Sequence, residues 1–82
     1  MPGRKTTKAQ KSALALALGR VLRKEREKAG LSQEAFSEQV SLSKNYVGNI
    51  ERGEYEASLS VLHRIARVLQ RSASDLLKES GY

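Results

Sequence analysis

Apolar residues recur at helical spacing in the first third of the chain. Leu14, Leu18 and Leu22 follow one another every four residues, which places them on one face of a helix. The neighbouring residues are mostly Ala and Leu, which are strong helix formers. The pattern predicts a helix from near residue 12 to residue 29, ended by Gly30.

Two shorter helices are predicted next. Ser32 and Ser43 can each act as an N-cap, and a leucine before each serine can pack against an apolar residue one turn into the helix. The helices are expected over 32–40 and 43–52, so that only two residues separate the first from the cap of the second. Two capped helices joined by so tight a turn predict a helix-turn-helix.

The remaining apolar residues predict a fourth and a fifth helix. Ser58 is the expected N-cap of the fourth helix, and Ser72 is that of the fifth. The apolar stripe of the fourth helix consists of Leu59, Leu62, Ile65, Ala66 and Leu69. Because no hairpin signal and no internal repeat occurs, the expected fold class is all-α, a compact five-helix bundle.

Composition adds size and charge to this picture. The chain has 82 residues, with 15 Lys and Arg against 9 Asp and Glu, which gives a formal net charge of +6. We expect one domain over residues 12–82, and the charge indicates an anionic partner, either nucleic acid or a membrane surface. Residues 1–11 contain basic but no acidic side chains. We interpret them as a flexible basic arm, which either lies along phosphates or is a solubilising tail.

The residue types argue against several classes of protein. The chain has no Cys and one His, and Asp75 is its single aspartate. We therefore expect no disulfide, no metal site, no cofactor and no enzymatic activity. No stretch approaches the roughly 20 apolar residues of a membrane span, so we expect a cytoplasmic protein without a membrane partner.

Two short motifs in the predicted helix-turn-helix are specific. Residues 31–34 read Leu-Ser-Gln-Glu, and residues 50–53 read Ile-Glu-Arg-Gly. With these motifs at this separation, residues 18–77 resemble the XRE family, the lambda repressor-like (Cro/cI-type) helix-turn-helix domains. The resemblance implies a five-helix bundle, usually dimeric, that binds operator DNA as a transcriptional regulator.

The resemblance also implies how DNA would be read. The helix over 43–52 would lie in the major groove with its N-terminal end toward the bases. Lys44, Asn45 and Asn49 share a polar face of this helix. Lysine can donate to guanine O6 and N7, and asparagine can pair with adenine N6 and N7, although either can also take a phosphate. We therefore expect these three residues to read bases.

Phosphate contacts are expected from the edges of the same surface. Gln33 opens the first helix of the motif, where free N–H groups favour an anion. Ser43 and Tyr46 carry hydroxyl groups, and Arg52 is a phosphate clamp or, alternatively, an ordinary solvated arginine. The arm would add Arg4, Lys5 and Lys8.

The family pattern implies one structural ion pair and shows departures in the backbone. Arg26 and Glu51 match the pair that ties the first helix to the third. Ser41 stands where the family's turn usually has Gly, and a left-handed conformation there costs a non-Gly residue about 1–2 kcal/mol. Gln70 and Arg71 replace the Gly and the apolar residue that the family usually has between the fourth and fifth helices. Gly48 lies inside the third helix, where Gly costs about 1 kcal/mol relative to Ala.

The expected assembly is a homodimer on a palindromic operator, acting as a repressor or autoregulator, since one recognition helix reads half a site. Apolar residues outside the core stripe are the candidate dimer interface, or they simply widen a small core. These residues are Val61, Val68, Leu76 and Leu77. The alternative function is an antitoxin-like or other protein-interaction subunit that keeps the fold. A further alternative is nonspecific binding of a polyanion or membrane surface through the arm.

Overall fold

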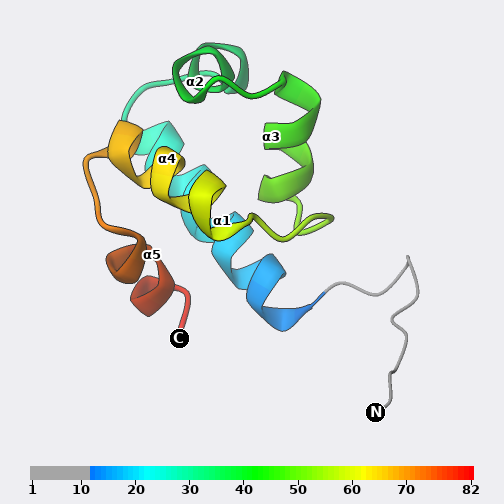
Figure 1. The fold of residues 1–82 in the computed structure, drawn as a ribbon, viewed down its shortest axis with the longest axis vertical. Helices are drawn as coiled ribbons and strands as arrows, with labels where there is room; N and C mark the ends of the chain where they lie inside the picture. The colour runs from blue at the N-terminus through cyan, green and yellow to red at the C-terminus, as the bar shows by residue number, and fades with distance from the viewer. Residues whose placement is uncertain (1–11) are drawn as a thin grey trace.

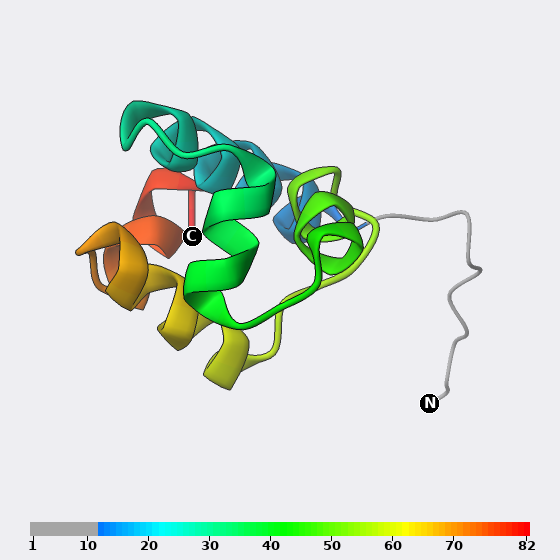
Figure 2. The same ribbon diagram turned by 90° about the horizontal axis from the view of Figure 1, so that it is seen from above.

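The computed structural model describes residues 12–82, which fold into five helices (Figure 1, Figure 2). The helices are α1 (Ala13–Lys28), α2 (Gln33–Val40), α3 (Lys44–Glu51), α4 (Leu59–Leu69) and α5 (Ala73–Glu79). No strand occurs between residues 12 and 82. The predicted all-α, five-helix fold is therefore confirmed, and the observed helices begin and end close to the predicted positions.

Every helix begins with the same local device. A serine in an extended conformation precedes the first helical residue, and its hydroxyl oxygen accepts the backbone N–H three residues further on. The five donor–acceptor distances are 2.9, 3.0, 3.0, 3.2 and 3.0 Å along the chain. Each cap satisfies one N–H that the helix itself leaves unpaired, which typically contributes about 1 kcal/mol. The five caps are Ser12, Ser32, Ser43, Ser58 and Ser72.

Two helices end on non-glycine residues in the left-handed region. Ser41 after α2 has φ 62° and ψ 43°, and Gln70 after α4 has φ 59° and ψ 40°. In both, the next backbone N–H turns back to a carbonyl five residues earlier, from Leu42 to Ser37 and from Arg71 to Ala66. This closure satisfies carbonyls at the helix ends. Ser41 and Gln70 thus adopt the left-handed turn that glycine usually adopts, although their Cβ atoms make this conformation less favourable.

The five helices share one apolar core, to which each contributes one face. The largest fully buried side chains are Phe36, Leu22, Ile65, Leu76, Val40 and Val47. Leu76 has an exposed fraction of 0%, so its expected place in a dimer interface is wrong, because the core of the same chain already covers it. The expected core position of Leu59 is also wrong. Leu59 is the first residue of α4 and is 82% exposed, since the packed part of the stripe begins one turn later.

A glycine brings α1 and α3 into backbone contact. A Cβ atom on Gly19 would lie 2.5 Å from the carbonyl oxygens of both Ile50 and Glu51, which is far inside van der Waals contact. Leu16, on the other side of α1 from the leucine stripe, packs in the same way over Gly53, just after α3. The end of α3 therefore has a fixed position against α1.

Arg71 connects the C-terminal helix to the rest of the bundle. Its guanidinium forms ion pairs with Glu79 and, at a distance of 4.0 Å, with Asp75, both on α5. It also pairs with Glu25 of α1 at 3.1 Å. The hydrogen bond to Arg71 lowers the pKa of Glu79 below its ordinary value, and the same contact raises the pKa of Arg71. Ion pairs thus take the place of the apolar residue that the family usually has here.

The arrangement of residues 12–82 leaves one side of α3 uncovered by the other helices. α3 and α5 lie on opposite sides of the bundle in both views (Figure 1, Figure 2). α3 packs on α1 and α2. The face of α3 that points away from these helices is therefore free to meet a partner.

Candidate nucleic-acid interface

The exposed face of α3 is polar along its whole length. Lys44 and Asn45, in its first turn, are exposed, and Asn49 one turn later is half-buried. On the opposite face, Val47 and Ile50 are buried in the core, with exposed fractions of 2% and 3%. The helical period thus separates a packing face from a face that presents an amine and two amides, and the three expected base readers lie together on the second face.

Arg52 lies over the end of this face. Its Nη2 donates a hydrogen bond to Oδ1 of Asn49 at 2.6 Å. A Cβ atom on Gly48 would lie 3.0 Å from Nη1 of Arg52, so the guanidinium covers the glycine. The contact takes up one of the two acceptor positions on Oδ1 of Asn49.

A buried ion pair connects α3 to α1. Arg26 of α1 donates from Nε to Oε2 of Glu51 at 2.7 Å and from Nη2 to Oε1 at 3.1 Å, the two-bonded fork that the family pattern implies. Its Nη1 also donates to the carbonyl oxygen of Leu31 at 2.8 Å. The hydrogen bonds to Glu51 raise the pKa of Arg26. The side chains are only 9% and 3% exposed, so the pair fixes the distance between α1, α3 and the loop before α2.

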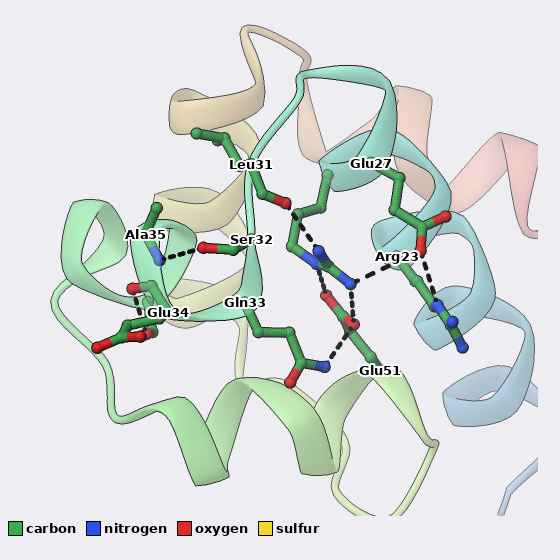
Figure 3. Close-up of polar contacts among 10 residues, drawn as sticks. Arg23, Glu27, Leu31, Ser32, Gln33, Glu34, Ala35 and Glu51 are labelled. Atoms are coloured by element: carbon green, nitrogen blue, oxygen red, sulfur yellow. Dashed lines mark hydrogen bonds and ion pairs between the residues drawn. The ribbon is translucent and has the colours of Figure 1, made fainter.

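Gln33 belongs to this buried network as well as to the surface. Its Nε2 donates to Oε1 of Glu51 at 2.9 Å (Figure 3). One N–H of the side-chain amide is thus already used inside the protein, which the sequence did not indicate. The backbone N–H groups of Gln33 and Glu34 in the first turn of α2 lie ahead of the first intrahelical bond, which goes from Phe36 to the carbonyl of Ser32. Those N–H groups remain suited to an anion.

Ser43 and Tyr46 stand at the start of α3. The oxygen of Ser43 accepts the N–H of Tyr46 at 3.0 Å, while its hydroxyl proton stays available to an outside acceptor. The ring of Tyr46 packs partly on the core and meets the ring of Tyr55, with 5.7 Å between the ring centroids. Both hydroxyl-bearing residues therefore have a structural role in addition to any contact with DNA.

Arg64 is a positioning residue that sequence reasoning missed. From α4, its Nη1 donates to the carbonyl oxygens of Val40 at 2.9 Å and Ser41 at 3.3 Å. These carbonyls belong to the turn between α2 and α3, which the arginine thereby ties to α4. Arg64 is not part of the apolar stripe of α4, and it makes the contact only because the turn between α2 and α3 passes beside α4.

The other predicted site residues fall into two groups. Val61, Val68 and Leu77 are half-buried and pack against the core from α4 and α5. Arg4, Lys5 and Lys8 lie outside the described residues. Within residues 12–82, no group of three or more His, Cys, Asp or Glu side chains is placed to hold a metal ion. No helix in that range is long and apolar enough to cross a membrane.

Together, two short capped helices joined by a tight turn, with a polar outer face on the second, define a helix-turn-helix domain. A family model described as helix-turn-helix (HTH_3) matches residues 22–76. The chain belongs to this family, and the resemblance to XRE-type helix-turn-helix domains is confirmed.

Known relatives agree with this assignment. An uncharacterized HTH-type transcriptional regulator of Methanothermobacter thermautotrophicus is 39% identical over 64 residues, which cover 74% of this chain and 93% of that protein. The clp gene regulator ClgR from Corynebacterium glutamicum has a similar solved structure, with a TM-score of 0.82 and 32% identity, over 89% of this chain and 94% of that one. SinR, a master regulator for biofilm formation solved in complex with DNA, has a TM-score of 0.70 and 28% identity, over 73% of this chain and 97% of that one.

Proposed function

We propose that this chain is a sequence-specific, DNA-binding transcriptional regulator that reads double-stranded DNA through α3. The observation that carries the proposal is the exposed face of α3, where Lys44, Asn45 and Asn49 present polar groups while the opposite face is buried. The complex of SinR with DNA supports it, because that relative has the same fold. The helix enters the major groove with Lys44 and Asn45 foremost.

Each reader has a base that suits its chemistry. The amine of Lys44 donates to guanine O6 and N7, and the amide of Asn45 both accepts from adenine N6 and donates to N7. Asn49 is a third reader in this proposal. A good contact of this kind discriminates against a wrong base by about 1–3 kcal/mol.

Phosphate groups hold the helix in place on either side of the groove. The proposed contacts are the first turn of α2 at Gln33, the hydroxyls of Ser43 and Tyr46, and the guanidinium of Arg52. The arm adds Arg4, Lys5 and Lys8. These contacts supply affinity and salt dependence without selecting a sequence.

The proposed form is a homodimer that acts as a repressor or autoregulator on a palindromic operator in the cytoplasm. Two copies related by a two-fold axis would place their α3 helices in half-sites one DNA turn apart, about 34 Å. Val61, Val68 and Leu77 are the remaining candidates for the contact between copies, since they are only half-buried.

Selection of bound sequences from a pool of random double-stranded DNA tests the proposal. We expect a palindromic motif, with affinity for it falling steeply as salt is raised while the sequence preference persists. A pool with no enriched motif would favour a protein-interaction subunit instead. Sequence-independent binding that salt abolishes would favour a general polyanion binder.

A matched pair of lysine variants tests whether the DNA-binding site lies on α3. Lys44→Ala is expected to weaken binding to the selected motif and to relax preference at one position of each half-site. Lys78→Ala, the same change on α5 at the opposite side of the bundle, is the control and is expected to bind as the parent does (Figure 1). Equal binding by both variants, with intact helicity by circular dichroism, would contradict the assignment.

A further inference from the structure

The side chain of Arg52 is directed back along the reading face of α3. Arg52 is the C-cap of this helix, and its backbone lies at the end of the helix that is expected to be farthest from the bases. The guanidinium nevertheless lies beside Gly48, with Nη1 3.0 Å and Cζ 3.7 Å from the position of a Cβ atom there. The charge is thus about one helical turn, roughly 5 Å, nearer to Lys44 than the Arg52 backbone is.

Gly48 makes room for this conformation. A glycine inside a helix is unfavourable and calls for a packing reason. Here the guanidinium lies against the position of the missing Cβ atom, and the three nearest atoms outside the helix's own backbone all belong to the Arg52 side chain. A Cβ atom at position 48 would press on the end of the Arg52 side chain, which would have to shift by a few tenths of an ångström.

Asn49 fixes the orientation of the guanidinium. The hydrogen bond from Nη2 of Arg52 to Oδ1 of Asn49 measures 2.6 Å, and it uses one of the five N–H donors of the arginine. Asn49 is neutral, so this contact leaves the positive charge in place. The remaining donors form a rigid planar fork, the geometry that matches two neighbouring acceptors on a guanine edge.

Resting on the DNA-binding role proposed above, we propose that Arg52 is a base reader whose fork binds O6 and N7 of a guanine in the major groove. This role replaces the phosphate contact of Arg52 and the base contact of Asn49 proposed above. Asn49 becomes a positioning residue that holds the fork over Gly48. Since the guanidinium and Lys44 occupy successive turns of α3, they meet different base pairs of the half-site. Because an arginine fork also fits a phosphate, it is the place of the fork, beside Gly48 on the exposed face of α3, that favours a base.

The test compares Arg52→Lys, Arg52→Ala, Gly48→Ala and the double variant Gly48→Ala/Arg52→Ala with the parent chain. Each protein selects sequences from a random double-stranded DNA pool. Binding constants are then measured over a range of salt, for the parent's motif and for the motif with each guanine replaced. Arg67→Lys, an exposed arginine of α4, is the matched control for the charge-conserving change.

The base-reading role has a distinct signature. In Arg52→Ala, the preference for one guanine per half-site should fall about fivefold to a hundredfold. Arg52→Lys should lose only part of that preference, because lysine donates to the same guanine atoms without a rigid fork, and Gly48→Ala should reduce the preference for the same guanine. The double variant Gly48→Ala/Arg52→Ala should show the same guanine preference as Arg52→Ala alone, because the substitution at Gly48 acts only through the arginine. The thermal unfolding of Gly48→Ala should not fall below that of the parent, and Arg67→Lys should select the parent's motif.

Two results would overturn the inference, and they are distinguishable. If Arg52→Ala keeps the parent's preference for every guanine, weakens all sequences alike and lowers the salt slope by about one, Arg52 is a phosphate clamp. If the parent chain selects no motif at all, the proposed function fails, and the role of Arg52 fails with it.

Discussion

Arg26 and Arg23 lie one turn apart on α1. Because their surroundings differ, we expect them to contribute differently to the free energy of unfolding. Arg26 is buried and bonded to Glu51 and to the carbonyl of Leu31, whereas Arg23 pairs with Glu27 on the surface. Removing one member of a buried pair leaves the other charge without a partner in a poorly solvated place. Water and salt screen the exposed pair.

We therefore expect Arg26→Ala to lower the free energy of unfolding by about 3–5 kcal/mol. Arg23→Ala, the matched control on the same helix, should lower it by no more than about 0.5 kcal/mol. Urea denaturation of both variants measures the difference. Equal losses would show that the buried fork contributes no more than an exposed pair.

The left-handed residues after α2 and α4 give the second prediction at this scale. Ser41→Gly and Gln70→Gly should each raise the free energy of unfolding by about 1 kcal/mol, because glycine adopts a positive φ without the Cβ clash. Ala29→Gly is the control, since Ala29 ends α1 with φ −77°, where glycine only adds entropy to the unfolded chain. In thermal unfolding, Ser41→Gly and Gln70→Gly should melt at a higher temperature than the parent, and Ala29→Gly at a lower one.

Elements are positioned by close approach as well as by apolar stripes. We expect Gly19→Ala to lower the free energy of unfolding by about 1–3 kcal/mol, because its Cβ would overlap backbone oxygens at the end of α3. Gly48→Ala is the matched control, with only the flexible end of Arg52 in its way, and should raise stability by up to about 1 kcal/mol. Chemical denaturation compares them, and similar effects would mean that α1 and α3 adjust to the added methyl group.

The attachment of α5 depends on pH through Glu79. Its pKa lies below the ordinary value of 4.5, so its contribution to stability is complete above that pH and is lost as the pH falls through the folded-state pKa. Glu79→Gln should therefore be less stable than the parent at neutral pH, and the gap should close in acid. Thermal unfolding across this range measures it. Glu38→Gln, a change at an exposed glutamate of α2, is the control and should show a smaller gap.

The positive charge of the whole molecule is concentrated outside the helix-turn-helix. The helix-turn-helix over 32–53 has three acidic and two basic residues, whereas residues 1–11 have four basic residues and no acidic one. The general attraction to DNA should therefore come largely from outside the reading helix.

Deleting residues 1–10 should weaken binding to every sequence alike. The deletion removes Arg4, Lys5 and Lys8, so the slope of log affinity against log salt should fall by up to about 3, at roughly 0.9 per phosphate contact. The selected motif should stay the same. A changed motif would mean that the arm also contacts bases, and an unchanged slope would identify it as a solubilising tail.

The sequence by itself determined the helices and the polar, exposed face of α3. Serine caps, leucine stripes and glycine stops act within a few residues, so local rules located all five helices and the polar side of α3. Tertiary structure decided what lies between elements: the burial of Leu76, the exposure of Leu59, and the bond from Gln33 to Glu51. Arg64, Arg71 and the folded-back Arg52 belong to the same group. Periodicity gives the face of the helix on which such a side chain lies. Its partner depends on which other segment of the chain passes that face, and only the packing of the helices decides which segment this is.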